Sequence, residues 1–83
     1  MAEHTPRLIE GIDKAKAGEW DAAHAIAQSL EGHDHADWLH AILHKIEGDE
    51  RNSRYWYGRT NQNYESYPDA EAELDALKAV LTY

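Results

Sequence analysis

The stretch that decides the fold is residues 37–59, DWLHAILHKIEGDERNSRYWYGR. Its first part carries apolar residues at the three- and four-residue spacing of one helix face, and that pattern stops at Gly48. Glycine commonly follows the last turn of a helix, and Asp49 is suited to cap the helix that comes next. The stretch is therefore expected to form two antiparallel helices joined by a tight turn.

The rest of the chain extends this helical pattern and shows no convincing strand alternation. Thr5 and Pro6 are suited to open a first helix, because a hydroxyl caps the N-terminus and proline fits the first helical position. Gly18 and Gly32 are placed to end the first and second helices. We predict a single all-α domain over residues 1–83, with hairpin 1 at about 5–31, hairpin 2 at about 34–60, a loop at 61–67 and a capping helix at 68–82.

Each predicted helix except the short fourth one has an apolar stripe at helical spacing, which is expected to face the core. The stripes comprise Leu8, Ile12 and Ala15; Ala23, Ile26, Ala27 and Leu30; Trp38, Leu39, Ile42 and Ile46; and Ala70, Leu74, Leu77 and Leu81.

Four carboxylates stand at the start of the last predicted helix: Asp69, Glu71, Glu73 and Asp75. Negative charge is favourable near the positive end of a helix dipole, so these side chains are expected to stabilise the helix and to face solvent.

A weak internal repeat supports the hairpin interpretation. Residues 18–19 and 48–49 are both a glycine followed by an acidic residue, 30 positions apart, and Ala23 matches Ser53 at the same offset. A small residue there lets two antiparallel helices approach closely. The period is near the roughly 34 residues of a tetratricopeptide unit, so two tetratricopeptide- or Sel1-like hairpins are predicted. Alternatively, any helical hairpin with glycine at its turn gives such a match.

Composition excludes several classes of protein. The chain has 83 residues, a net charge of −8 and no cysteine, so disulfides and thiolate metal sites are excluded and binding to nucleic-acid backbones is not expected. No apolar run approaches the roughly 18–20 residues of a membrane span, and residues 1–10 lack the apolar segment of a signal peptide. We expect a cytoplasmic protein whose partners are proteins or peptides, with no nucleic acid and no membrane.

Two of the six histidines stand four residues apart on the predicted third helix. At about 100° per residue, His40 and His44 lie on one side of that helix, and Asp37 and Glu47 lie on the same side. Two imidazoles one turn apart can bind a divalent cation such as zinc or nickel, and a carboxylate can complete or orient the site. The alternative is a solvated polar face on which histidine–carboxylate pairs stabilise the helix.

The metal hypothesis needs a third histidine, and the sequence leaves its identity open. His24 on the preceding helix could supply it, and so could His33 or His35 in the loop. A metal site requires one of them to lie within a few ångströms of the pair, whereas an interaction module does not. The candidate metal residues are His24, His40, His44 and Glu47.

Three consecutive aromatic residues stand on the predicted fourth helix: Tyr55, Trp56 and Tyr57. Because they cover about 200° of its surface, they cannot all face one small core. Trp56 is expected to pack inward, and an exposed tyrosine beside arginines is suited to anchor a protein or peptide partner or a second copy of the chain. Alternatively, all three reach across a thin core. The candidate partner-binding residues are Arg54, Tyr55, Tyr57 and Arg59.

This region also resembles a family of small, mainly bacterial all-helical proteins. The resemblance rests on W-x-x-A-H at residues 20–24, H-A-x-L-H-x-x-E-G-D at 40–49 and Y-W-Y at 55–57. Gly58 and Thr60 depart from the arginine and alanine of that pattern, so no basic pocket is inferred after the triplet. The Trp-Tyr pair followed by a basic residue is similar to Sel1-like repeats, whose known role is protein binding. The resemblance implies a fold and a region of interest, not an activity.

The sequence therefore favours a protein-interaction or structural module. An enzyme is not the expected function, because the chain has neither a cysteine nucleophile nor a Gly-x-Ser-x-Gly elbow and shows no sign of a substrate pocket. The module requires no cofactor. The alternative is a divalent-metal protein, hydrolytic or not, that uses His40, His44 and a third histidine.

Overall fold

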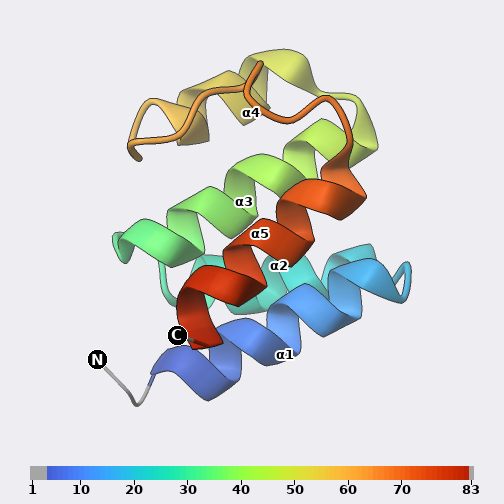
Figure 1. The fold of residues 1–83 in the computed structure, drawn as a ribbon, viewed down its shortest axis with the longest axis vertical. Helices are drawn as coiled ribbons and strands as arrows, with labels where there is room; N and C mark the ends of the chain where they lie inside the picture. The colour runs from blue at the N-terminus through green and yellow to red at the C-terminus, as the bar shows by residue number, and fades with distance from the viewer. Residues whose placement is uncertain (1–3, 83) are drawn as a thin grey trace.

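The fold is all-α, as predicted. The computed structural model describes residues 4–82 and has five helices and no strand within that range (Figure 1). No helix in the same range is both long and apolar enough to cross a membrane. The helices are α1 (Thr5–Lys16), α2 (Trp20–Ser29), α3 (Asp34–Glu47), α4 (Glu50–Tyr57) and α5 (Ala70–Thr82).

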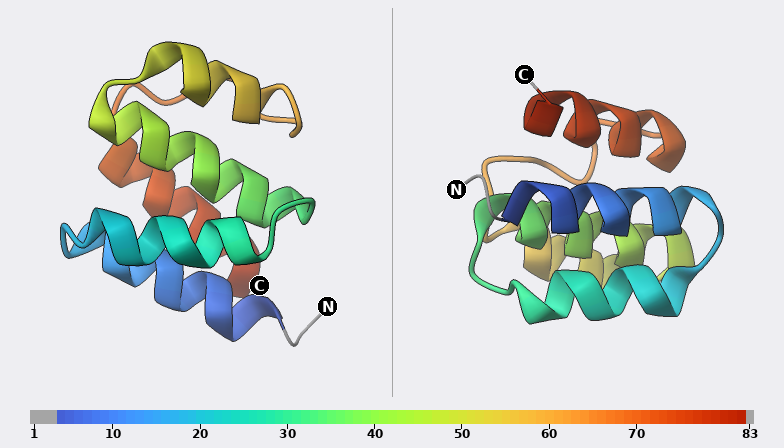
Figure 2. Two further views of the ribbon diagram at one scale, coloured as in Figure 1. Left: turned by 180° about the vertical axis from the view of Figure 1, so that it is seen from behind. Right: turned by 90° about the horizontal axis from the view of Figure 1, so that it is seen from below.

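Tight glycine turns pair the first four helices. Gly18 and Gly48 have φ values of +84° and +87°, a conformation that glycine adopts far more readily than other residues. The Asp49 carboxylate accepts a hydrogen bond from the backbone N–H of Asn52, which confirms the predicted cap of α4. The predicted cap at Thr5 is wrong, because Thr5 already lies inside α1. The helices of each pair lie side by side, as the predicted hairpins require (Figure 2).

The five helices form three layers around α3. Seen from below, α5 lies on one side, α1 and α3 lie in the middle, and α2 and α4 lie on the far side (Figure 2). Helix α5 contacts α1 and α3, so it covers the face that the two hairpins leave open. This arrangement agrees with two hairpins plus a covering helix; the tetratricopeptide-like detail stays a prediction.

The central helix α3 is buried on every side over residues 36–44. It contacts all four other helices, and residues 36–44 are all buried. Of the two interpretations of the side that carries Asp37, His40 and His44, the solvated face is therefore wrong for these three residues, because α2 and α4 pack against α3. Ile46 was expected in the core, yet its side chain is 44% exposed because α3 emerges from the bundle near its C-terminus.

A buried carboxylate fastens α5 to the bundle. Glu73 was expected to face solvent, but it is 0% exposed, because α5 turns this side toward α3 and α4. Lys45 pairs with Glu73 at 2.8 Å, and Trp38 Nε1 and the Tyr57 hydroxyl both donate to its other oxygen, at 2.8 and 2.5 Å. The buried charge is therefore fully hydrogen-bonded.

The segment between α4 and α5 is longer than the predicted loop. It runs over residues 58–69, and α5 begins at Ala70, with the Asp69 carboxylate accepting from the backbone N–H of Glu71. Lys45 Nζ also donates to two backbone carbonyls of this segment, those of Tyr64 and Tyr67, each at 2.9 Å. One lysine thus ties both the segment and α5 to α3.

Candidate metal centre

Three histidines from two helices meet between α2 and α3. One ring nitrogen of each of His24, His40 and His44 lies within 4.8 Å of the other two, and Nε2 of His24 lies 3.0 Å from Nε2 of His40. Two nitrogens at tetrahedral positions around zinc stand about 3.3 Å apart, given Zn–N bonds of about 2.0–2.1 Å. The three nitrogens are therefore close enough to share one ion.

The other two candidate third ligands lie elsewhere. His33 is the N-cap residue of α3, and its ring contacts the rings of His4 and His35 at 5.2 and 5.8 Å between centroids. The structure thus selects His24 from the three histidines that the sequence offered.

Packing between α2 and α3 positions the triad. The buried stripe of α2 that includes Ala23 and Ala27 was predicted from its spacing, and it places His24 on the adjoining edge of the helix. Trp20 Nε1 donates a 2.6 Å hydrogen bond to the backbone carbonyl of Leu43, which ties the start of α2 to the end of α3. His40 and His44 follow each other by one turn of α3, so both rings face α2.

Indole rings support two of the three imidazoles. Trp20 stacks on His24, with ring centroids 4.6 Å apart and planes inclined by 16°. Trp56 of α4 stacks on His40 more closely, at 3.8 Å and 13°. Sequence reasoning missed this role of the tryptophans. The four-residue spacing of Trp20 and His24 could have indicated the first stack, but the second depends on how α4 packs.

Glu47 lies outside the triad and orients one of its members. Its Oε2 atom is 2.7 Å from Nδ1 of His44, so the imidazole donates to the carboxylate and keeps the lone pair of Nε2 free. A carboxylate on the second nitrogen is the usual arrangement for a metal-binding histidine. Toward the triad, the role that fits Glu47 is therefore orientation of His44. With His44 and Asp49, Glu47 also forms a second, more exposed group whose possible ligand atoms lie within 4.8 Å of one another.

The surroundings favour the neutral form of two of the three imidazoles. Burial first, and then the neighbouring rings of His24 and His44, lower the pKa of His40 to about 4. Burial, followed by the proximity of His44, also lowers the pKa of His24. Neutral imidazole is the form that binds a metal ion, so little proton competition is expected at His24 and His40 near pH 7.

The candidate partner-binding residues do not form one surface. Tyr57 is buried and bonded to Glu73, whereas Tyr55 is 57% exposed. The guanidinium of Arg59 lies over the Trp56 ring and donates to the Tyr55 hydroxyl. Arg54 pairs with two carboxylates, those of Glu50 and Glu65.

Comparison with protein-family models, with curated proteins and with solved structures finds no match to this chain. The family resemblance drawn from the sequence motifs therefore stays a prediction. Function is inferred from the geometry of the site.

Proposed function

We propose that this protein binds a divalent transition-metal ion through His24, His40 and His44. The observation that supports the proposal is the meeting of three ring nitrogens within 4.8 Å of one another. Imidazole ligands suit zinc, nickel, cobalt and copper. Three histidines leave at least one coordination position for water or another ligand, as in catalytic zinc sites.

A purely structural role accounts less well for the same residues. His40 and His44 are 2% and 6% exposed, and Nδ1 of His40 has no hydrogen-bond partner within the described part of the chain. An unpaired buried polar atom costs free energy, and an apolar side chain would fill the space without that cost. A metal ion would take the place of the 3.0 Å hydrogen bond that now joins Nε2 of His24 to Nε2 of His40 across the helix interface.

Direct binding measurements test the proposal. Zinc and nickel should be titrated against a chromophoric chelator in wild type, His24→Ala, His44→Ala and the matched control His35→Ala. We expect a single ion per chain in wild type and in the control. Either triad substitution should weaken binding by more than the about 10–100-fold that loss of an outer-shell partner costs. No binding by wild type, or equal binding by all four proteins, would contradict the proposal.

A protein-interaction module is a second candidate, favoured by the exposure of Tyr55. This ring stands on α4 at 57% exposure, beside Arg59, and such aromatic–arginine pairs are enriched at interfaces. Sedimentation velocity over a concentration series, in wild type and Tyr55→Ala, tests for a homodimer. Self-association that the substitution removes would support it, and a monomer at every concentration would count against it. For either function we expect a cytoplasmic location, as the sequence predicts.

A further inference from the structure

His40 lacks the polar support that its neighbour in the triad has. The Nδ1 atom of His44 is held by Glu47, but the corresponding atom of His40 is buried and has no hydrogen-bond partner in the described residues. Metal-binding histidines are almost always oriented by a hydrogen bond at the second ring nitrogen. Another contact must therefore fix the His40 ring.

That contact is the stack of the Trp56 indole on the ring. The two ring centroids are 3.8 Å apart and the planes are inclined by 13°, whereas the His44 ring is farther away, at 5.0 Å and 25°. Because the ring lies flat against the indole, its Nε2 atom stays directed at His24.

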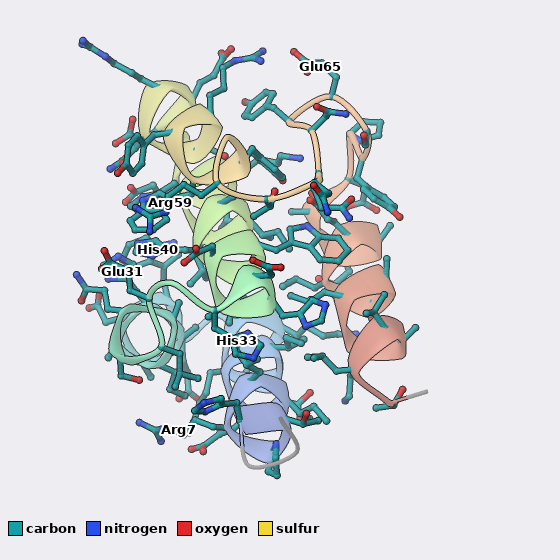
Figure 3. The ribbon with its side chains drawn as sticks, turned by 90° about the vertical axis from the view of Figure 1, so that its left-hand side faces the viewer. Arg7, Glu31, His33, His40, Arg59 and Glu65 are labelled. Carbon is teal, nitrogen blue, oxygen red and sulfur yellow. The ribbon has the colours of Figure 1, made fainter. Side chains whose placement is uncertain are left out.

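The indole of Trp56 is itself held in place from outside. The guanidinium of Arg59 lies 5.2 Å from the Trp56 ring, and its Nε atom lies 3.6 Å from the buried carboxylate of Asp37. Asp37 in turn accepts a hydrogen bond from the backbone N–H of Gly32. Figure 3 shows Arg59 and His40 on the side of α3 that faces away from α5.

We propose that Trp56 is a positioning residue of the metal site. It takes the place of the missing hydrogen bond to His40 and so sets the affinity of the site and the geometry of the bound ion. Arg59 supports it by fixing the indole. This inference rests on the proposed metal binding, and it assigns α4 a part in a site whose ligands all come from α2 and α3.

The test compares three substitutions in the full chain. Trp56→Leu removes the flat face, Trp56→Phe keeps an aromatic face, and Trp38→Leu is the matched control, because the Trp38 indole is also buried but bonds Glu73. Zinc affinity is measured by chelator competition, and the absorption spectrum of bound Co²⁺ reports the ligand geometry. Denaturant unfolding without metal identifies variants that are folded at the assay temperature.

We expect zinc affinity to fall about tenfold or more in Trp56→Leu, with an altered Co²⁺ spectrum, and to be largely restored in Trp56→Phe. Trp38→Leu should lose stability but keep the wild-type affinity and spectrum. Arg59→Gln keeps the Trp56 indole and should weaken binding less than Trp56→Leu. Because it also removes the cation that faces the buried Asp37 carboxylate, its stability is measured in the same way.

The outcomes separate the two proposals. If wild type binds zinc and folded Trp56→Leu binds it equally well with an unchanged Co²⁺ spectrum, the positioning role is overturned and the metal site stands. A loss of affinity in Trp38→Leu as large as that in Trp56→Leu would also overturn it, because the effect would then follow from stability. If wild type binds no metal, both proposals fail.

Discussion

Lys45 is the residue on which the buried charge of Glu73 depends. The lysine and the carboxylate form an ion pair that is almost wholly removed from solvent. Burial, and then the hydrogen bond to Glu73, raises the pKa of Tyr57, so this hydroxyl stays a donor to the carboxylate at every ordinary pH. The hydrogen-bonding capacity of the buried carboxylate is met only while Lys45, Trp38 and Tyr57 all bond to it.

Replacing Lys45 with methionine should destabilise the fold by about 3–5 kcal/mol, because it leaves Glu73 charged and uncompensated in the core. It also frees two carbonyls of the segment 58–69. Urea unfolding followed by circular dichroism measures the change in the free energy of unfolding. Lys16→Met is the matched control, since Lys16 pairs with Asp75 at the surface. A similar loss in both variants would contradict the argument.

Glu47 is expected to act on the metal site through His44. Glu47→Ala should weaken zinc binding by about 10–100-fold, because the ring loses its orienting acceptor, and Glu47→Gln should restore part of the affinity. Asp49→Asn is the control, since it removes a nearby charge while keeping the cap of α4. Chelator competition gives the three affinities. An equal effect of Asp49→Asn would contradict orientation, because it would point to charge or to ligation by the group of His44, Glu47 and Asp49.

How much of the site the sequence reveals differs from residue to residue. The pair His40 and His44 with Glu47 follows from helical spacing alone. The choice of His24 over His33 or His35 does not, because it depends on how α2 packs against α3. The burial of Glu73 is also hidden, since a carboxylate in the first turns of a helix is favourable at the surface as well.

Among the elements, helix α3 begins at a cap that is sensitive to pH. Nδ1 of His33 accepts a hydrogen bond from the backbone N–H of His35, which requires that this nitrogen carry no proton. Burial lowers the pKa of His33, and the nearby His4 and His35 lower it further, while Asp34 opposes them. The folded pKa thus lies below the value of about 6.5 in the unfolded chain.

The free energy of unfolding of the metal-free protein should therefore fall as the pH drops below about 6.5, because the unfolded chain then binds more protons. His33→Asn keeps a capping acceptor that does not titrate, so its stability should fall less steeply between about pH 7 and about pH 5. Urea unfolding in the presence of a chelator gives both curves, and His35→Gln is the control. Identical slopes for wild type and His33→Asn would refute this account.

Element boundaries were predictable where glycine or aspartate determines them. The turns at Gly18 and Gly48 and the cap at Asp49 require local geometry that few other residues supply. The burial of α3 on all sides was not predictable, because its polar residues follow the same spacing as a solvated face. Only the presence of α2 and α4 over that face distinguishes the two cases.

Across the whole molecule, the triad joins the two hairpins. His24 belongs to the first hairpin, and His40 and His44 belong to the second, so one ion would link α2 to α3. A chain of 83 residues has a small core, which limits its stability. An ion that binds the folded state and not the unfolded state would raise that stability.

Zinc should therefore raise the midpoint of thermal unfolding. At a hundredfold excess over the dissociation constant, binding to the folded state alone adds about 2.7 kcal/mol. Since each kcal/mol shifts the midpoint of a domain of this size by about 4–8 °C, the expected rise is roughly 10–20 °C. Magnesium prefers oxygen ligands and should have no such effect. The rise should disappear in His24→Ala, because the first hairpin then supplies no ligand.

Hydrogen exchange should show added protection in α2 as well as in α3, because both helices hold the ion. Protection confined to α3, or an equal rise in His24→Ala, would mean that the ion binds without joining the hairpins.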